Sequence, residues 1–476
     1  MNEKAGSKRP AFSYLVIRYN SPMSHIITRF APSPTGYFHA GSYRTALFSC
    51  IFARQNKGKF ILRIEDTDKE RSKKEYEENI VESLKWLGLK YDEFYRQSDR
   101  TEIYKKYIQQ LIDSGHAYVS NEAAGEMKTK PSTLHPTPLR SSVIRFKNPN
   151  KKVVFDDLIR GKIEFDTTEL NDFVIAKSLE EPVFHLVVVI DDAESGITHI
   201  IRGEDHISNT PRQILIYEAL GKTPPLYAHI PLLLAADRSK LSKRNGAVPI
   251  TEYRTKGYLP EAVVNYLALL GWHPSDEREV LSFEEIIKEF KLDRVQKAGA
   301  VFDEEKLKWF NRQYLAKLSD EDFIHHAKLF IPEWLGGGSQ TLKRLIPLIK
   351  EKISAFGEIT DLFGAKGELA FLKALPEYPA DMLLWKKKPD TAAAKTHLTK
   401  AKETFMDIKE KDFTAESIKT ALWPYAEANG KGDVLWPLRV ALTGQERSPD
   451  PFSSAFVLGR EEALTRIEKA LKKLAS

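Results

Sequence analysis

The sequence contains one cysteine, Cys50, in 476 residues. A single thiol excludes an intramolecular disulfide framework and any zinc site built from several cysteines, and it is typical of a protein of the reducing cytoplasm. Long hydrophobic runs are also missing, because no apolar stretch approaches the ~20 residues that a membrane-spanning helix needs. We therefore expect a cytoplasmic protein that uses neither zinc nor a membrane.

The two common glycine motifs of nucleotide-binding proteins are missing too, since the chain has neither a G-x-G-x-x-G fingerprint nor a P-loop. There is also no internal repeat. What is present is typical of a folded globular protein: 42% hydrophobic and 29% charged residues. The formal charge of +6 allows a polyanionic partner without requiring one. A chain of this length exceeds one ordinary hydrophobic core, so several domains are expected.

Strand-like and helical patterns alternate in the first half of the chain, which predicts an α/β fold with a Rossmann-like parallel sheet. Within it, the apolar run Val183–Ile190 is expected to be a strand buried on both faces, and Ser72–Glu75 to be a helix-capping box. The last third is helical in pattern. We expect an N-terminal appendage (1–22, with Met23 as an alternative start), a first half of the sheet domain (23–103), an α+β insertion (104–185), a second half (186–225), a mainly helical region with a lysine-rich loop (226–319) and an all-α domain (320–476).

The stretch from residue 26 to residue 49 organises the rest of the chain. An apolar strand is followed by Pro32 and Pro34, which cannot continue a sheet ladder, and then by a helix that begins near His39. A strand, a tight loop and a helix N-terminus favour bound phosphate, because free N–H groups and the helix dipole both attract anions. The stretch therefore predicts an anion site with an imidazole and one glycine, Gly41, at the helix mouth.

Charged side chains follow the ends of three expected strands, where ligands bind in open parallel sheets. Two arginines, Arg29 and Arg202, are suited to a carboxylate ligand, because guanidinium groups bind carboxylates in two-point contacts. The carboxylate of Glu65 is suited to a ligand ammonium group. The basic segment Lys240–Arg244 could supply positive charge during attack on a phosphate. These groups predict one cleft that brings a carboxylate substrate to a nucleotide.

These motifs resemble those of the class I aminoacyl-tRNA synthetases in their glutamyl form. The segment His39–Ser42 is similar to the family's His-Ile-Gly-His motif, and Lys240–Arg244 is similar to its Lys-Met-Ser-Lys-Ser motif. Residues 29–36, 63–68 and 201–206 resemble bacterial glutamyl-tRNA synthetases in particular. The resemblance is specific over residues 25–318, and the helical remainder is similar only in length and character.

By this resemblance, the chain would use ATP with Mg²⁺ to convert L-glutamate to glutamyl-adenylate, once tRNA(Glu) is bound, and would transfer the glutamyl group to the terminal adenosine of that tRNA. The insertion would bind the acceptor end, and the all-α domain the anticodon. Glutamate would be held by Arg29, Ala31, Ser33, Glu65, Phe184 and Arg202. ATP would be held by His39, Gly41, Ser42, Glu204, Lys240, Leu241, Ser242, Lys243 and Arg244, with His39, Gly41, Lys240 and Lys243 in catalysis.

The chain departs from this family at a few positions. Phe184 stands where relatives commonly have a tyrosine, so a hydroxyl contact worth about 0.5–1.5 kcal/mol would be lost. Asn245 replaces a frequent histidine, and the segment Tyr118–Ser120 lacks the cysteines with which some relatives bind zinc.

The sequence leaves several interpretations open. A truncated relative that glutamylates a queuosine base, a glutaminyl-tRNA synthetase, a nucleotidyltransferase of the same superfamily and a non-catalytic RNA-binding paralogue are the alternatives. A monomer is the default for the family. Whether tRNA(Gln) is also charged with glutamate is open as well, and charging it would call for an amidotransferase partner.

Overall fold

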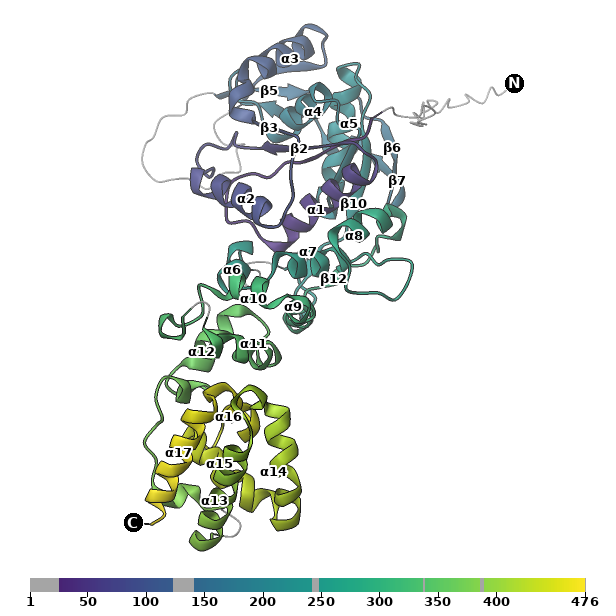
Figure 1. Ribbon diagram of the computed structural model, residues 1–476. Helices are drawn as coiled ribbons and strands as arrows, with labels where there is room; N and C mark the ends of the chain where they lie inside the picture. Colours follow the sequence, from purple (N-terminus) through teal and green to yellow (C-terminus); the bar gives the residue numbers. More distant parts are fainter. Residues whose placement is uncertain (1–24, 123–140, 242–247, 337–338, 386–388, 476) are drawn as a thin grey trace, which may run out of the picture. The chain divides into compact units, whose positions relative to one another are not determined.

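The computed structural model describes residues 25–122, 141–241, 248–336, 339–385 and 389–475 (Figure 1). The chain divides into two compact units, residues 1–253 with 260–307 and residues 254–259 with 308–476. The first unit is mixed α/β and the second is helical, which confirms the predicted fold class. In the described part of the chain, no helix is both long and apolar enough to cross a membrane. The predictions of an N-terminal appendage and of an alternative start at Met23 fall outside the described residues.

A seven-stranded sheet with the order β3-β2-β1-β9-β10-β6-β7 lies at the centre of the first unit (Figure 1). Its neighbouring strands are parallel except for the antiparallel β6–β7 hairpin. The order places β1 and β9 side by side, so the carboxyl ends of these two strands lie at one edge. The strands are β1 (Ile27–Phe30), β2 (Lys59–Ile64), β3 (Glu93–Arg96), β6 (Lys152–Asp157), β7 (Gly161–Asp166), β9 (His199–Gly203) and β10 (Leu226–Ile230).

Helices cover both faces of this sheet. Helix α1 (Ala40–Gln55) packs on β1, β2 and β9, and it also contacts α7 (Pro260–Leu269) and α8 (Phe283–Glu289). Helices α3 (Thr101–Asp113), α4 (Phe184–Glu194) and α5 (Thr210–Ala219) form a separate hydrophobic cluster with strand residues such as Ile61, Ile200 and Tyr227. Because strands with both faces covered need apolar side chains on each face, β2 is buried along five of its six residues.

Two local predictions are wrong. The apolar run Val183–Ile190 is not a strand but most of α4 (Phe184–Glu194). A helix that is buried almost all round gives the same continuous apolar run as a buried strand, so periodicity cannot separate the two. The capping box at Ser72–Glu75 does not form, because α2 (Lys74–Trp86) begins two residues later and has Lys73 as its N-cap.

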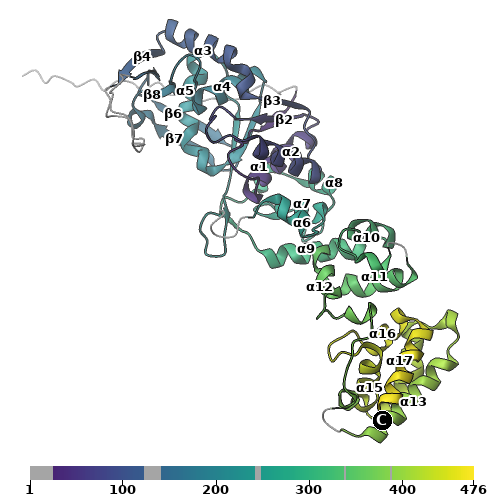
Figure 2. The same ribbon diagram turned by 90° about the vertical axis from the view of Figure 1, so that its left-hand side faces the viewer.

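The inserted region contributes strands to two different sheets. Four of its strands are β5 (Ser141–Phe146), β6, β7 and β8 (Phe173–Ala176). Strands β4 (Ala117–Glu122), β5 and β8 form a small antiparallel sheet beside α3 (Figure 2). The β6–β7 hairpin instead joins the main sheet through β10, where Asp157 lies opposite Tyr227. The hairpin is therefore part of the layer that carries the strand ends.

The second unit is helical where it is described, as predicted, but it is not continuously helical. In the described residues between 353 and 390, the chain forms short turns around α12 (Ile359–Phe363) instead of long helices. The C-terminal helices share one hydrophobic core. The helices of this unit are α9 (Glu304–Lys317, from residue 308), α10 (Asp320–Ala327), α11 (Gln340–Lys352), α12, α13 (Thr391–Asp407), α14 (Ala415–Asn429), α15 (Lys431–Thr443), α16 (Pro451–Leu458) and α17 (Arg460–Lys473).

Candidate active site

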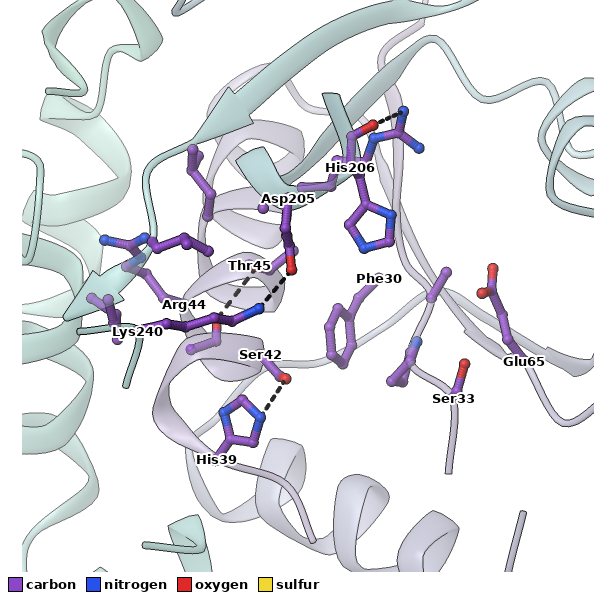
Figure 3. Close-up of a pocket in the computed structure, with 18 of the residues that line it drawn as sticks. Phe30, Ser33, His39, Ser42, Arg44, Thr45, Glu65, Asp205, His206 and Lys240 are labelled. Carbon is purple, nitrogen blue, oxygen red and sulfur yellow. Dashed lines mark hydrogen bonds and ion pairs between the residues drawn. The ribbon is translucent and has the colours of Figure 1, made fainter. Parts of the chain in front are cut away.

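A cavity of about 310 Å³ lies at the carboxyl ends of β1, β9 and β10, next to the N-terminus of α1 (Figure 3). It gathers most of the predicted site residues: Arg29, Ala31, Ser33, His39, Gly41, Ser42, Glu65, Phe184, Arg202, Lys240 and Leu241 line it. Glu204 is not among the described residues that line it. Ser242, Lys243 and Arg244, also predicted, lie outside the described residues. The sequence pattern thus predicted one cleft, and the structure brings its parts together.

The mouth of α1 is suited to bind an anion. His39 is the N-cap residue in an extended conformation, and its Nε2 lies 3.5 Å from the hydroxyl of Ser42 (Figure 3). The first helical turn contains no acidic residue that would repel a phosphate. A Cβ added at Gly41 would meet only the ring of His39, at 3.4 Å. The backbone therefore does not require glycine here, and the missing side chain leaves space at the cavity wall.

A buried network of charges lies beneath the amino-acid side of the cavity. Arg29 donates to the carboxylate of Asp192 at 3.2 Å, and Arg63 donates to the same carboxylate at 2.6 Å. A second nitrogen of Arg63 donates to Glu65 at 3.0 Å. Burial by itself would raise the pKa of Asp192, but Arg29 and Arg63 hold it below its ordinary value. Burial raises the pKa of Glu65 although Arg63 opposes the change.

Arg202 has a different environment from Arg29. Its guanidinium donates to His229 Nε2 at 3.1 Å, to the hydroxyl of Thr210 at 2.8 Å and to the carbonyl oxygen of His206 at 3.5 Å. All three acceptors are uncharged, and no carboxylate forms an ion pair with Arg202 in the described part of the chain. Burial lowers the pKa of Arg202 to about 10, so the group is still a cation at neutral pH. It offers an uncompensated positive charge to a ligand.

The acidic pair at the end of β9 divides between two tasks. Glu204 accepts from Arg160 at 2.6 Å and from the backbone N–H of Leu232 at 2.8 Å. Asp205 lines the cavity and accepts from the ammonium of Lys240 at 2.8 Å (Figure 3). Glu204, which was predicted to bind ATP, therefore holds Arg160 and the backbone of Leu232, whereas Asp205 lines the cavity.

Sequence reasoning missed several residues of the site. Asp192 was not predicted, because a strand over Val183–Ile190 leaves no reason for the next acids to meet Arg29. The pair Asp191 and Asp192 after an apolar run is the signal that could have identified it. Arg44 lines the cavity from the middle of α1 and donates to the carbonyl oxygens of Leu270 and Pro231. Burial lowers its pKa to about 9. No sequence signal distinguishes Arg44 from a surface arginine on a helix.

Comparison with known proteins shows the family of this chain. The family model of the tRNA synthetases class I (E and Q), catalytic domain, matches residues 25–138 and 135–309, and an anticodon binding domain matches residues 313–471. The chain is 42% identical to the glutamate–tRNA ligase of Aquifex aeolicus (strain VF5), over 95% of this chain and 100% of that protein. It is also 42% identical to the glutamate–tRNA ligase of Sulfurihydrogenibium sp. (strain YO3AOP1), over 93% of this chain and 98% of that protein.

Solved structures give the same result. The crystal structure of a glutamate tRNA ligase from Elizabethkingia meningosepticum CCUG26117, in complex with its amino acid, superposes with a TM-score of 0.81 and 34% sequence identity, over 95% of this chain and 100% of that chain. The parallel sheet, the helix-mouth cavity and the helical second unit thus define a class I aminoacyl-tRNA synthetase. Within that class, the chain belongs to the glutamate–tRNA ligase family. It is an enzyme that forms aminoacyl-tRNA, and its class uses ATP.

Proposed function

We propose that the chain joins L-glutamate to tRNA(Glu) in two steps. In the first, a carboxylate oxygen of glutamate attacks the α-phosphorus of ATP, the bond from that phosphorus to the bridging oxygen breaks, and pyrophosphate leaves. In the second, a hydroxyl of the terminal adenosine attacks the glutamyl carbonyl carbon and AMP leaves. The observation that carries this proposal is a single cavity bounded by the mouth of α1 and by the uncompensated charge of Arg202.

The amino acid is proposed to bind on the β1 and β9 side of the cavity. The side-chain carboxylate of glutamate pairs with Arg202, because that guanidinium has no carboxylate partner among the described residues. The substrate ammonium pairs with Glu65, whose carboxylate is buried and whose ionised form gains from a cation nearby. Arg29, which also pairs with Asp192, is proposed to help hold the amino acid from the cavity wall. Ala31, Ser33 and Phe184 form the remaining wall.

ATP is proposed to bind at the mouth of α1, where Gly41 and Ser42 line the cavity beside His39. Lys240 and Leu241 also line it, and the basic segment continues into Ser242, Lys243 and Arg244, outside the described residues. Lys243 is proposed to stabilise the pentavalent phosphorus and the leaving pyrophosphate, a charge that develops most in the transition state. Glu204 supports this side indirectly by holding Leu232, which lines the cavity.

Mg²⁺ is proposed to enter on the triphosphate. The described residues contain no cluster of three or more His, Cys, Asp or Glu side chains arranged for a metal. Mg²⁺ commonly needs only one or two carboxylates when phosphates and water supply the other oxygens. Asp205 is a carboxylate at the cavity wall, but it already pairs with Lys240. We therefore assign no side chain of this chain as a ligand of Mg²⁺. When bound, the ion would neutralise charge on the phosphates.

The remaining parts of the chain are proposed to bind the tRNA: residues 104–185 its acceptor end, residues 226–319 its stem and residues 320–476 its anticodon. We further propose a cytoplasmic monomer that needs no zinc. Charging of tRNA(Gln), with a partner amidotransferase to convert the product, stays an open extension of this proposal, since it depends on anticodon contacts in the second unit.

Pyrophosphate exchange tests the function directly. We expect exchange with L-glutamate only when tRNA(Glu) is present, and little exchange with glutamine or aspartate. Exchange that ignores tRNA would point to a nucleotidyltransferase or to another branch of the synthetases. Equal exchange with glutamine would contradict the pairing of the side-chain carboxylate of glutamate with Arg202, because the side-chain amide of glutamine carries no charge for that guanidinium to pair with.

A further inference from the structure

Arg202 and His229 lie directly opposite each other on the neighbouring strands β9 and β10. Arg202 Nε donates to His229 Nε2 at 3.1 Å, so this ring nitrogen must be an acceptor without a proton. The other ring nitrogen, Nδ1, lies 2.6 Å from a carboxylate oxygen of Asp157. Both side chains of this second pair are fully buried. The imidazole is therefore neutral, with its proton on Nδ1 pointing to Asp157.

The carboxylate of Asp157 is fixed by the turn of the β6–β7 hairpin. It accepts from the backbone N–H groups of Ile159 at 3.0 Å, Arg160 at 2.8 Å and His229 at 3.1 Å. Burial by itself would raise the pKa of Asp157, but His229 and these N–H groups hold it below its ordinary value. A fixed, ionised carboxylate therefore determines which nitrogen of His229 carries the proton.

We propose that His229 and Asp157 are positioning residues for Arg202. They hold the guanidinium toward the cavity through a neutral ring, so that its charge remains available for the carboxylate of the substrate. This inference rests on the proposed function, in which Arg202 binds glutamate.

Arg29 shows what a direct carboxylate partner does. Its guanidinium pairs with Asp192, and much of its charge is compensated before any ligand binds. At Arg202 the carboxylate stands one imidazole ring further away. An imidazole acceptor orients the guanidinium as a carboxylate would, but it does not compete with the ligand for the charge. His229 thus orients the guanidinium of Arg202 without neutralising its charge.

The same turn supports a second site residue. Arg160, three residues after Asp157, donates to Glu204, which in turn holds the backbone of Leu232 at the cavity. The β6–β7 hairpin falls within residues 104–185, the range expected to hold the acceptor end of the tRNA. The same hairpin therefore holds His229 through Asp157, on the proposed glutamate side, and Glu204 through Arg160, on the proposed ATP side.

The test compares two substitutions at His229 in the full-length enzyme. In His229→Leu the acceptor is lost, and the KM for glutamate is expected to rise roughly tenfold or more, with little change in the KM for ATP. In His229→Gln the amide oxygen can accept from Arg202 while its NH₂ group donates to Asp157. This variant should restore most of the glutamate affinity. Aminoacylation and pyrophosphate exchange provide both constants, and thermal unfolding checks that each variant is folded.

A neighbouring histidine provides the matched control. His199 is also buried on β9, its Nδ1 lies 2.9 Å from the Thr198 hydroxyl, and its ring packs against Phe52. It is not among the described residues that line the cavity. His199→Leu removes a buried histidine from the same sheet, and we expect it to leave the KM for glutamate unchanged.

A double variant distinguishes positioning from a structural role. If His229 acts through Arg202, then His229→Leu should add almost nothing to the KM for glutamate of Arg202→Ala. The same rise with and without Arg202 would overturn the inference and leave the proposed function standing, and so would a failure of His229→Gln to restore affinity in a folded protein. If Arg202→Ala itself raises the requirements for glutamate and ATP equally, then Arg202 does not bind the amino acid, and the inference fails together with that part of the proposed function.

Discussion

Asp192 accepts a hydrogen bond of 2.6 Å from Arg63, and both side chains are completely excluded from solvent. The same carboxylate also pairs with Arg29 on the adjacent strand β1. One acid on α4 thus pairs with two arginines that each lie one residue before the end of a strand, β1 or β2. A buried charge of this kind is tolerated only when it is paired and hydrogen-bonded, so the three side chains depend on one another.

Asp192→Asn is expected to lower the free energy of unfolding of the catalytic unit by about 3–5 kcal/mol at neutral pH, because it leaves the buried guanidinium of Arg29 without its anion and removes one of the anions of Arg63, which keeps Glu65. The pKa of Asp192 is held below its ordinary value in the folded protein. Its contribution is therefore complete above the unfolded pKa, about 3.9, and is lost as the pH falls through the folded value. Denaturant unfolding between pH 7 and pH 3 measures the difference between the variant and the native protein, which should shrink in acid.

The exposed pair of Lys74 and Glu78 provides a control, because an ion pair at 3.5 Å on the surface is screened by solvent. Glu78→Gln should change neither the stability nor its dependence on pH. A difference for Asp192→Asn that is the same at pH 7 and pH 3 would show that ionisation of Asp192 does not stabilise the fold.

Gly41→Ala is expected to weaken ATP binding without weakening the fold. Alanine is favoured over glycine within a helix by up to about 1 kcal/mol, and the new methyl group meets only the His39 ring, at 3.4 Å. The methyl group would enter the space where phosphate is proposed to bind, at a cost of about 1–3 kcal/mol to ATP binding. The KM for ATP should therefore rise while the melting temperature stays constant or increases.

Gly58 provides the opposite case. A Cβ at Gly58 would lie 2.1 Å from the carbonyl oxygen of Ile26, so Gly58→Ala must shift the backbone. That variant should lower the melting temperature. If Gly41→Ala instead lowers the melting temperature and leaves the KM for ATP unchanged, the glycine is there for the backbone and not for the ligand.

The sequence predicted the parts of the site that depend on local pattern. The strand, turn and helix around His39 can be read from consecutive residues, and the ends of β2 and β9 follow from short apolar runs that stop at charged residues. Residues that depend on distant contacts were not predictable in this way. Asp192 meets Arg29 from 163 positions away, and His229 meets Arg202 from 27 positions away on another strand.

Two places in the chain show where local pattern carries too little information. The run Val183–Ile190 has no helical period because α4 is buried almost all round, so a strand fitted equally well. At the end of β9, Glu204 and Asp205 are adjacent acids, and spacing alone does not show which one faces the cavity. In the structure, Arg160 in the β6–β7 turn forms an ion pair with Glu204, and Asp205 lines the cavity.

Phe184→Tyr is expected to improve glutamate binding. Phe184 begins α4 at the cavity wall, and its ring lies 5.9 Å from that of His206. Burial lowers the pKa of His206 to about 4, so its ring is neutral at pH 7 and places no charge beside Phe184. A new hydroxyl could form one hydrogen bond worth about 0.5–1.5 kcal/mol, which corresponds to a two- to tenfold lower KM for glutamate. An unchanged KM in a folded variant would place the ring outside the reach of the amino acid.

Lys243→Ala is expected to slow formation of the adenylate while leaving ground-state binding of glutamate nearly unchanged. A lysine that reaches the phosphates chiefly in the transition state affects kcat more than KM, and the loss of one such group costs about 10²–10³ in rate. Arg238→Asn is the matched control, because it removes a positive charge two residues before the basic segment, at an exposed residue with φ of 63°, a conformation that asparagine tolerates. The rate of pyrophosphate exchange should show a large loss for Lys243→Ala and almost none for Arg238→Asn. Equal losses would mean that the segment acts only through its net charge, and an unchanged rate for Lys243→Ala would remove that lysine from the chemical step.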